Sequence, residues 1–430
     1  MKTSQYNILI PYKGNIIVYN TLWNSFILVD SKNKLLDYIS GKEDVNDISS
    51  NVPSIIMQKN IVVEDSTDEK NQIRTLLTNN VYDEKEMEII IMPTLGCNFR
   101  CWYCYETHDN RMEKMSSHDI CNIVKYIEKK MESNPLTKII SIRFFGGEPF
   151  LYFDEVIKPL LEDIEKVAIK YHVDYVASAT TNASLIKPSY LKFMKSHNFK
   201  YLQITLDGNK ERHNRIRFAH SGDNSYDVIV GNIKESISVG IRVTLRLNIS
   251  EHTELDVKRL LADFDDVTDK ELIVFSIYKV WQSKEEVNAI IDKIVGEIRN
   301  SGFHCTSYYS TPSSLWSICY ADKENEIVIK PGGYIYKCTA RDFSQERVEG
   351  RLNEDGEIMW SKQHKKRQET SVFDNKACMN CKIMPICIGG CRQKHIEHND
   401  NNTCIYHMDE LSKVEYARKV FMDKLETLII

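Results

Sequence analysis

The sequence predicts an α/β protein built on a partial (β/α)6 barrel, with a small α+β unit before it and a cysteine-rich region after it. Strand-like and helix-like segments alternate six times in the middle of the chain, the first residues carry a hairpin pattern, and eight of the twelve cysteines lie between Cys305 and Cys404. A chain of 430 residues exceeds the size of one hydrophobic core. We therefore expect three domains, at 1–85, 86–300 and 301–430.

The first domain is predicted from its short periodic segments. Residues 6–10 and 16–18 alternate between apolar and polar on either side of Lys13-Gly14-Asn15, which is typical of a hairpin. Short helices are expected at 34–40 and 68–79, with a strand at 61–63 between them.

The second domain is predicted from the alternation of strands with amphipathic helices. Parallel strands need crossover connections, usually helices, and six units rather than eight indicate a partial barrel. Functional residues gather at the carboxyl ends of the strands in such folds. The strands are expected at 88–92, 139–145, 174–180, 201–206, 241–248 and 272–278, and the helices at 116–131, 154–171, 189–197, 226–239, 254–264 and 284–298.

The third domain departs from this alternation. Hairpins are expected at 327–336, turning at Pro331-Gly332-Gly333, and around Asp355-Gly356. A region with so few long periodic elements needs cross-links or metals to hold its shape.

Composition limits the classes of function. A hydrophobic fraction of 42% with 27% charged residues is that of a globular protein, and a net charge of -5 argues against a nucleic-acid partner. The sequence has no secretory pattern in its first 30 residues and no apolar run long enough to span a membrane, so we expect a cytoplasmic protein without a membrane partner. Cysteines in a reducing compartment are expected to bind metal rather than to form disulfides.

One cysteine motif carries most of the chemistry. Cys97, Cys101 and Cys104 follow an apolar strand with the spacing Cys-x3-Cys-x2-Cys. Three thiolates suit a four-iron cubane and leave its fourth iron open, whereas ferredoxins use other spacings with a fourth cysteine close by. The alternatives are a zinc site, although zinc normally takes four ligands, and three unrelated buried thiols.

This motif resembles the signature of radical S-adenosylmethionine (SAM) enzymes, which implies a [4Fe–4S] cluster whose open iron chelates the methionine part of SAM. Reductive cleavage of SAM then releases a 5′-deoxyadenosyl radical that abstracts hydrogen from the substrate. The resemblance implies a turn on the methionine amino group, an aromatic residue against the adenine, and an arginine on the carboxylate. Polar groups at strand ends are also expected near the cofactor. The matching residues are Gly146, Gly147, Glu148, Pro149, Tyr103, Arg217, Asn182, Asp207 and Asn248.

Seven further cysteines resemble the SPASM extension of peptide-modifying radical SAM enzymes, which holds two auxiliary [4Fe–4S] clusters. The resemblance assigns Cys319, Cys338 and Cys391 to the first cluster and Cys378, Cys381, Cys387 and Cys404 to the second. Cys305 is either the fourth ligand of the first cluster or a buried thiol, in which case the open iron binds substrate. Cys121 is expected in the core, within a helix. Zinc ribbons are the alternative for this region.

These resemblances imply a radical SAM oxidoreductase that matures a ribosomally made precursor peptide by a thioether or carbon–carbon cross-link, with flavodoxin or ferredoxin as an electron donor. The first domain is then a module that pairs the precursor with a sheet edge, or a packing cap on the barrel. Sulfatase-maturing enzymes, which form formylglycine, are the alternative. Their base is an aspartate after the cysteine matching Cys338, where this chain has Thr339. A non-catalytic metal-binding scaffold is the third hypothesis. The catalytic residue that moves a proton is not assigned.

Overall fold

The computed structural model describes residues 1–40, 54–106, 113–219, 222, 224–250, 257–280, 282, 287–307, 314–398 and 402–429. Contacts divide the chain into two compact units. The barrel unit comprises residues 84–309 and 325–364, and the terminal unit comprises residues 1–83, 310–324 and 365–430.

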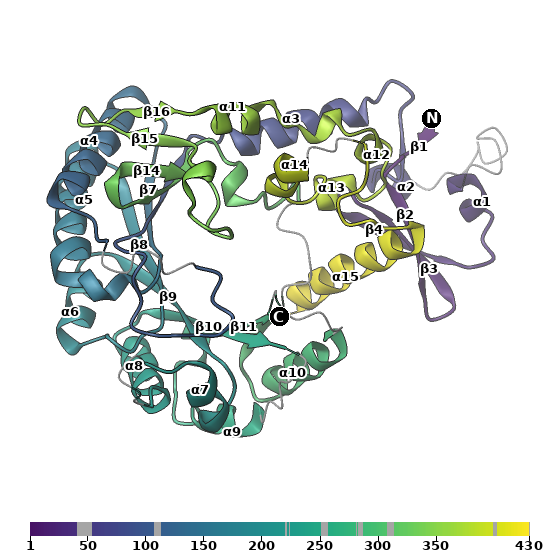
Figure 1. Ribbon diagram of the computed structural model, residues 1–430. Coiled ribbons are helices and arrows are strands. Elements are labelled where there is room, and N and C mark those ends of the chain that lie inside the picture. The colour runs from purple at the N-terminus through teal and green to yellow at the C-terminus, as the bar shows by residue number, and fades with distance from the viewer. Residues whose placement is uncertain are drawn as a thin grey trace. The chain divides into compact units, whose positions relative to one another are not determined.

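The barrel unit contains the parallel sheet that the sequence predicts. Its six strands are neighbours in chain order, so the α/β fold class with a partial barrel is confirmed (Figure 1). A further short strand, β12 (His304–Ser307), pairs in parallel with β11. The six strands are β6 (Glu86–Ile91), β7 (Ile139–Phe144), β8 (Asp174–Thr181), β9 (Phe199–Leu206), β10 (Arg242–Ile249) and β11 (Ile273–Lys279).

Helices connect these strands and cover one face of the sheet (Figure 1). Ser116 and Asp119 form a capping box at the start of the first helix. A short helix, α7, was not predicted, and parts of the helices expected at 254–264 and 284–298 lie outside the described residues. The helices are α4 (Ser117–Ser133), α5 (Lys158–Tyr171), α6 (Pro188–Ser196), α7 (Lys210–Ile216), α8 (Tyr226–Ser238), α9 (Val257–Ala262) and α10 (Asn288–Asn300).

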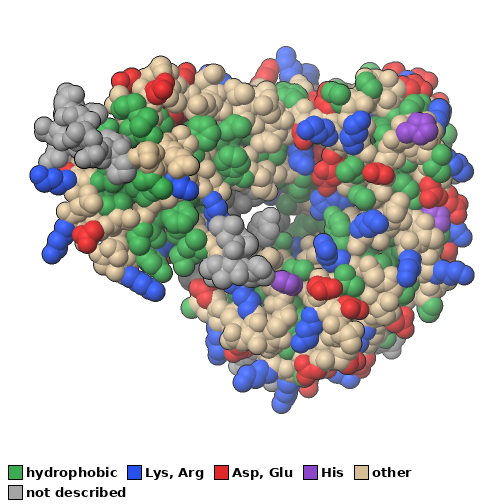
Figure 2. All heavy atoms as spheres, turned by 180° about the vertical axis from the view of Figure 1, so that it is seen from behind, with side chains coloured by type: hydrophobic (Ala, Val, Ile, Leu, Met, Phe, Trp, Pro, Cys, Tyr) green, Lys and Arg blue, Asp and Glu red, His purple; other side chains and the backbone are tan. Residues whose placement is uncertain are grey.

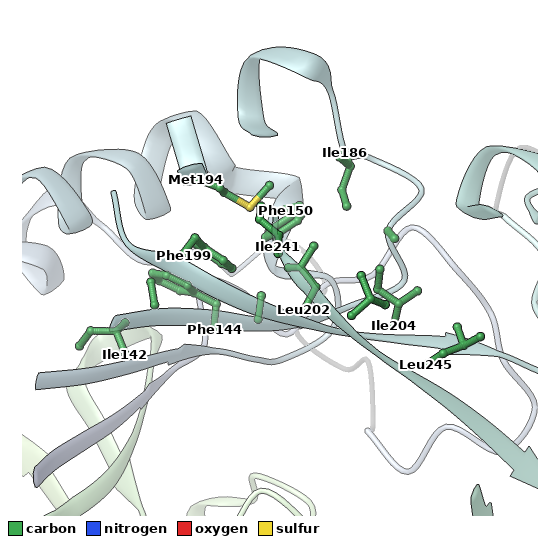
Figure 3. Close-up of a cluster of buried hydrophobic side chains, with 14 of the residues drawn as sticks. Ile142, Phe144, Phe150, Ile186, Met194, Phe199, Leu202, Ile204, Ile241 and Leu245 are labelled. Carbon is green, nitrogen blue, oxygen red and sulfur yellow. The ribbon is translucent and has the colours of Figure 1, made fainter. Parts of the chain in front are cut away.

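The strands alternate because the two faces of the sheet have different surroundings. On β7, Ile142 and Phe144 are buried in the hydrophobic core, whereas Arg143 between them is polar and half-buried. Figure 3 shows Ile142 and Phe144 in one hydrophobic cluster with Phe199 of β9 and Met194 of α6. The apolar face thus packs on the helices, and polar side chains line the other face.

The barrel sheet extends beyond residue 300, which corrects the expected boundary of the third domain. β13 (Glu326–Lys330) pairs in parallel with β6, and three antiparallel strands follow it. Pairing with β6 therefore places residues 325–364 in the barrel unit. β13 forms the first predicted hairpin with β14 (Tyr334–Tyr336), and β15 (Gly350–Leu352) forms the second with β16 (Ile358–Trp360).

The amino-terminal part of the terminal unit contains the predicted hairpin of β2 (Asn7–Tyr12) and β3 (Asn15–Asn20), and Lys13 and Gly14 in its turn both have positive φ. A third antiparallel strand, β4 (Ser25–Asp30), was not predicted. The strand at 61–63 pairs with the start of the chain. The remaining elements are β1 (Lys2–Thr3), β5 (Val62–Val63), α1 (Leu35–Ile39), α2 (Ser54–Gln58) and α3 (Glu69–Val81).

The carboxyl-terminal part of the terminal unit ends in a 20-residue helix, α15 (Glu410–Ile429), which corrects the expectation that this region lacks long elements. Its Tyr416, Ala417 and Phe421 share a core with Ile8 and Tyr19 of the first strands. The other helices are α11 (Lys362–Glu369), at the boundary of the two units, α12 (Lys376–Met379), α13 (Met384–Cys387) and α14 (Arg392–His398).

The surface carries charges of both signs. On the face that Figure 2 shows, basic and acidic side chains are interspersed. In the part of the chain that the structure describes, every helix is too short or too polar to cross a membrane.

Candidate cluster and cofactor sites

The loop that carries Cys97, Cys101 and Cys104 begins directly after β6 and is anchored on both sides. The Gly96 N–H donates to the Thr94 hydroxyl at 2.9 Å, and this hydroxyl donates to the Glu113 carbonyl at 2.6 Å. Between the cysteines, Phe99 is buried and the Arg100 N–H donates to the Phe218 carbonyl at 3.1 Å. The backbone between the thiols is therefore held in place by the protein.

The three thiols are close enough to interact electrostatically. Burial raises the pKa of Cys97 to about 12 and the pKa of Cys104 to about 11, and repulsion from the Cys101 thiolate adds to both shifts. Without metal the thiols are protonated, so iron has to displace protons to bind here. Three thiols that repel one another as anions fit a cationic cluster, which removes that repulsion.

The turn at Gly146 and Gly147 packs directly on the cysteine loop. A Cβ atom on Gly147 would lie 2.1 Å from the Gly96 carbonyl oxygen, and one on Gly146 would lie 2.4 Å from that of Thr94. Gly146 also has a φ of +114°, which favours glycine. The structure thus brings together the turn and the cysteine loop, which the sequence predicted to share one edge of the sheet.

The other two residues of the predicted turn, Glu148 and Pro149, are buried and contact the protein itself. Glu148 is fully buried, and its carboxylate accepts hydrogen bonds from the Asn182 N–H at 2.7 Å, the Thr181 hydroxyl at 2.7 Å and the Phe150 N–H at 3.0 Å. Pro149 is buried at the start of a short helix. Glu148 therefore fixes the end of β8, and with it Asn182, whose amide Nδ2 lies 4.0 Å from the Cys97 sulfur.

Four predicted cofactor residues converge at the ends of neighbouring strands. The Tyr103 hydroxyl donates to Asp207 and accepts from Arg217 Nη1 at 2.7 Å and Asn248 Nδ2 at 3.2 Å. Asn248 also donates to Asp207 at 3.3 Å. The sequence predicted that Tyr103 lies against adenine, whereas the structure directs its hydroxyl to this polar cluster. The contact with adenine stays a prediction.

Electrostatics favour an ion pair within this cluster. Burial raises the pKa of Asp207, and the buried guanidinium of Arg217 opposes that effect. His213, which the sequence did not single out as a contact, accepts from the Asp207 N–H at 3.3 Å. Burial, and then the charge of Arg217, lower the pKa of His213 well below its usual value, so the imidazole is neutral. His213 thus positions Asp207 without adding charge.

Two buried polar atoms near the thiols are unsatisfied. Nε of Arg217 and one carboxylate oxygen of Glu106 have no hydrogen-bond partner among the residues that the structure describes. Buried polar groups are normally paired, so such atoms indicate a missing ligand. A sulfonium amino acid carries the amino and carboxylate groups that would satisfy them. The residues therefore fit SAM beside a three-thiol cluster.

A second thiol region lies in the terminal unit. Cys378, Cys381, Cys387 and Cys404 line one hollow. Burial raises the pKa of Cys378 and Cys387 to about 12, and repulsion between the thiolates adds to it. The other lining residues are Ala377, Ile383, Met384, Gly389, Ile405, Tyr406 and Lys413. Four thiols in a mostly apolar hollow fit a fully ligated iron–sulfur cluster.

The remaining cysteines are distributed over both units. Cys319 and Cys391 belong to the terminal unit, where their chain neighbours Ile318 and Arg392 line a second hollow. Cys338 belongs to the barrel unit, so the three-cysteine set of the first auxiliary cluster stays a prediction.

Two cysteines lie apart from these sets. Cys305 is buried in the barrel core, which favours a buried thiol over a ligand. Cys121 lies in α4, but it is exposed, which corrects the expectation of a core residue, because Ile120 and Ile123 occupy the buried face of that helix. Among the described residues, no three His, Cys, Asp or Glu side chains converge as ligands of a single metal ion.

Comparison with known proteins agrees with this geometry. Residues 91–264 match the family model described as the Radical SAM superfamily. A cysteine-type anaerobic sulfatase-maturating enzyme of Clostridium novyi is 24% identical over 78% of this chain and 98% of its own length.

Two further similarities extend over nearly the whole chain. The radical SAM cyclopropyl synthase TigE of Paramaledivibacter caminithermalis is 22% identical over 94% of this chain and 89% of its own length. The solved structure of Streptococcus suis SuiB bound to precursor peptide SuiA covers 93% of this chain and 97% of that chain, with a TM-score of 0.53 and 15% identity. At this low identity, the similarity to SuiB shows a shared fold alone.

Proposed function

Residues 91–264 are a radical SAM domain, and from this premise we propose that the enzyme cross-links a ribosomally made precursor peptide through a thioether or carbon–carbon bond. When bound, SAM and a [4Fe–4S] cluster supply a 5′-deoxyadenosyl radical that abstracts hydrogen, and auxiliary clusters supply an electron acceptor. Cys97, Cys101 and Cys104 hold the first cluster. The convergence of these thiols with unsatisfied buried polar groups carries the proposal.

The polar cluster beside the thiols binds and orients SAM. Arg217 is buried, and its unsatisfied Nε pairs with the SAM carboxylate. Gly146 and Gly147 let the backbone approach the ligand closely, and Glu148 holds that turn against the end of β8. Asp207 and Asn248 bind ribose hydroxyls, and Tyr103 lies against the adenine. Since Tyr103 contacts both Asp207 and Asn248, its position sets the space that is left for the ribose.

The leading sheet supports a peptide substrate. Among the described residues, β4 pairs only with β3, so its other edge has free backbone groups. Such an edge accepts an extended peptide by strand addition. Leu28 of β4 is an exposed apolar side chain that a bound peptide would cover. SuiB, whose solved complex contains a precursor peptide, is similar in fold over 93% of this chain.

Auxiliary clusters serve as the electron acceptors. Closing a thioether or carbon–carbon bond removes two hydrogen atoms from the peptide, so after one is abstracted an electron and a proton still have to leave. The hollow lined by Cys378, Cys381, Cys387 and Cys404 binds an auxiliary cluster suited to that electron. A second auxiliary cluster on Cys319, Cys338 and Cys391 brings the total to three. A cytoplasmic flavodoxin or ferredoxin supplies the electron for SAM cleavage.

Oxidation of a sulfatase cysteine or serine to formylglycine is the second candidate function. The sulfatase-maturating relative of Clostridium novyi, aligned over 98% of its length, favours it. Thr339, in place of the aspartate base that the sequence comparison implies, argues against it, since a threonine hydroxyl does not accept a proton at neutral pH.

Co-expression with a short open reading frame beside this gene tests the proposal. We expect the encoded peptide to lose two hydrogen atoms per linkage, as measured by mass spectrometry. Replacement of a cysteine sulfur by oxygen would instead establish formylglycine formation. A purified enzyme that releases no 5′-deoxyadenosine from SAM under strong reductant would favour a non-catalytic scaffold.

A further inference from the structure

One of the side chains that line the four-thiol hollow of the terminal unit is cationic. Its lining residues are four cysteines, six side chains or glycines without charge, and Lys413 of α15. The Lys413 side chain is only 19% exposed, so solvent screens its charge less than that of a surface lysine. The hollow therefore contains a built-in positive charge beside the thiols.

The position of Lys413 is fixed by its helix. One turn further along α15, the Tyr416 hydroxyl donates to the Ile386 carbonyl at 3.0 Å, next to Cys387. Ala417 and Phe421 pack into the same core as Ile383 and Ile386. The ammonium of Lys413 is held by Glu410 Oε1 at 2.6 Å. These contacts bind α15 to the segment that carries the thiols.

The charge of Lys413 acts on the thiols. Lys413 lines the hollow together with all four cysteines, and most of its side chain is shielded from solvent. Glu410, which pairs with this ammonium from one turn earlier on α15, has a side chain that is 80% exposed. The cation therefore lies beside the thiols, whereas the charge of the anion paired with it is screened by solvent.

We propose that Lys413 raises the reduction potential of the cluster bound by Cys378, Cys381, Cys387 and Cys404, and that Glu410 limits this effect. A cluster gains one negative charge when it accepts one electron, so a fixed cation stabilises the reduced form more than the oxidised form. Lys413 thus makes this cluster a stronger electron acceptor than it would be without that charge. This inference rests on the proposed auxiliary cluster, but not on the identity of the peptide.

Potentiometric titration followed by EPR tests this inference in enzyme without peptide. Cys97→Ala, Cys101→Ala and Cys104→Ala are combined as a background that leaves only the auxiliary clusters. Two midpoint potentials are then measured. We expect Lys413→Met to lower one of them by about 59 mV, which is a tenfold change in the equilibrium constant of a one-electron couple, and to leave the other unchanged. Lys413→Arg should keep the parent value, and Glu410→Gln should raise the same potential.

The control is Arg418→Met, which removes an equal charge from the exposed part of the same helix. A shift for Lys413→Met no larger than that of Arg418→Met would overturn the inference, as would shifts of the same sign in Lys413→Met and Glu410→Gln. If Lys413→Met takes up no iron, Glu410→Gln tests the inference instead. A raised potential in Glu410→Gln supports the inference, and a potential that is not raised overturns it. An unmodified peptide in co-expression would refute the proposed function and leave these potentials unaffected.

Discussion

The two thiol regions of this chain differ in number of ligands and in surroundings. The loop after β6 offers three thiols, and beside it lie buried polar groups that protein neighbours do not fully satisfy, such as Arg217 Nε. The hollow of the terminal unit offers four thiols among mostly apolar side chains and one lysine. Desolvation raises the pKa of Cys97 in the first region and of Cys378 in the second, so this effect alone does not distinguish the two regions.

Under the proposed function, this difference would give the iron of the two regions separate tasks. Three protein ligands leave a coordination position for a substrate, and the nearby polar groups recognise it. Four protein ligands close the cluster, so only electrons are exchanged. The polar surroundings of a cysteine set therefore indicate its role as clearly as the number of cysteines does.

The largest expected effect comes from removing one thiol from each region. Cys97→Ala should reduce 5′-deoxyadenosine formation to background, because two thiols do not hold a cubane in the reactive position. Cys381→Ala should leave this formation within a few fold of the parent and abolish the cross-linked peptide. Anaerobic assays by chromatography and mass spectrometry check both results, with Cys121→Ala, exposed on α4, as the control. Equal loss of 5′-deoxyadenosine in both variants would remove the distinction.

Arg217→Met should affect only the barrel region. The variant leaves buried Asp207 without its counter-charge, which typically costs about 3–5 kcal/mol, and removes the proposed partner of the SAM carboxylate. We expect SAM to bind at least about tenfold more weakly in equilibrium dialysis, a change of about 1.4 kcal/mol. Iron content and the EPR signals of the auxiliary clusters should be those of the parent. Unchanged SAM affinity would contradict the assigned role.

A smaller effect is expected from alanine substitutions at two glycines that differ in the space around them. The Cβ atom of Gly147→Ala would lie 2.1 Å from a backbone oxygen, so we expect a stability loss of about 1–3 kcal/mol and weaker SAM cleavage. Gly231→Ala, in the interior of α8 with no atom within 4 Å, should instead gain about 0.5–1 kcal/mol. Thermal denaturation measures both. A Gly147→Ala protein as stable and active as the parent would show that the turn does not constrain the cysteine loop.

The smallest expected effect tests whether the terminal unit binds peptide as well as metal. Leu28→Glu places a charge on an exposed apolar position of edge strand β4. We expect roughly three- to tenfold weaker binding of the precursor peptide, since burying a leucine contributes at most about 1.5–3 kcal/mol. Fluorescence anisotropy with labelled peptide measures it, and 5′-deoxyadenosine formation without peptide should not change. Met359→Glu, on edge strand β16 of the barrel unit, is the control and should bind peptide normally.

Much of the fold follows from local periodicity. The six barrel strands lie within about two residues of their expected ranges, because each alternates between the helix-covered face and the polar face. β4 was missed since Phe26 to Val29 form an apolar run without alternation. α7 was missed because it is short and polar, and its Asn209 cap and buried His213 hold it. The signal for α15 was present, since Val414, Ala417, Phe421 and Leu425 recur at helical spacing.

The candidate sites follow from the sequence only in part. The common edge of parallel strands predicts that the turn at Gly146 lies near Cys97, and the resemblance to radical SAM enzymes adds Tyr103 and Arg217 to this site. The insertion of the Tyr103 hydroxyl among Asp207, Arg217 and Asn248 depends on how a loop packs, which no local pattern encodes. The same holds for Gln282, whose side chain donates to the Tyr103 carbonyl at 2.8 Å, and for Lys413 of α15, which lines the hollow that the four thiols share.

The EPR spectrum of the reduced enzyme with and without SAM tests the central difference between the two thiol regions. We predict that SAM changes the spectrum of the parent enzyme and has no effect on the variant that lacks Cys97, Cys101 and Cys104. A parent spectrum that SAM leaves unaltered, or an equal change in the variant, would contradict a SAM-binding cluster in the barrel loop.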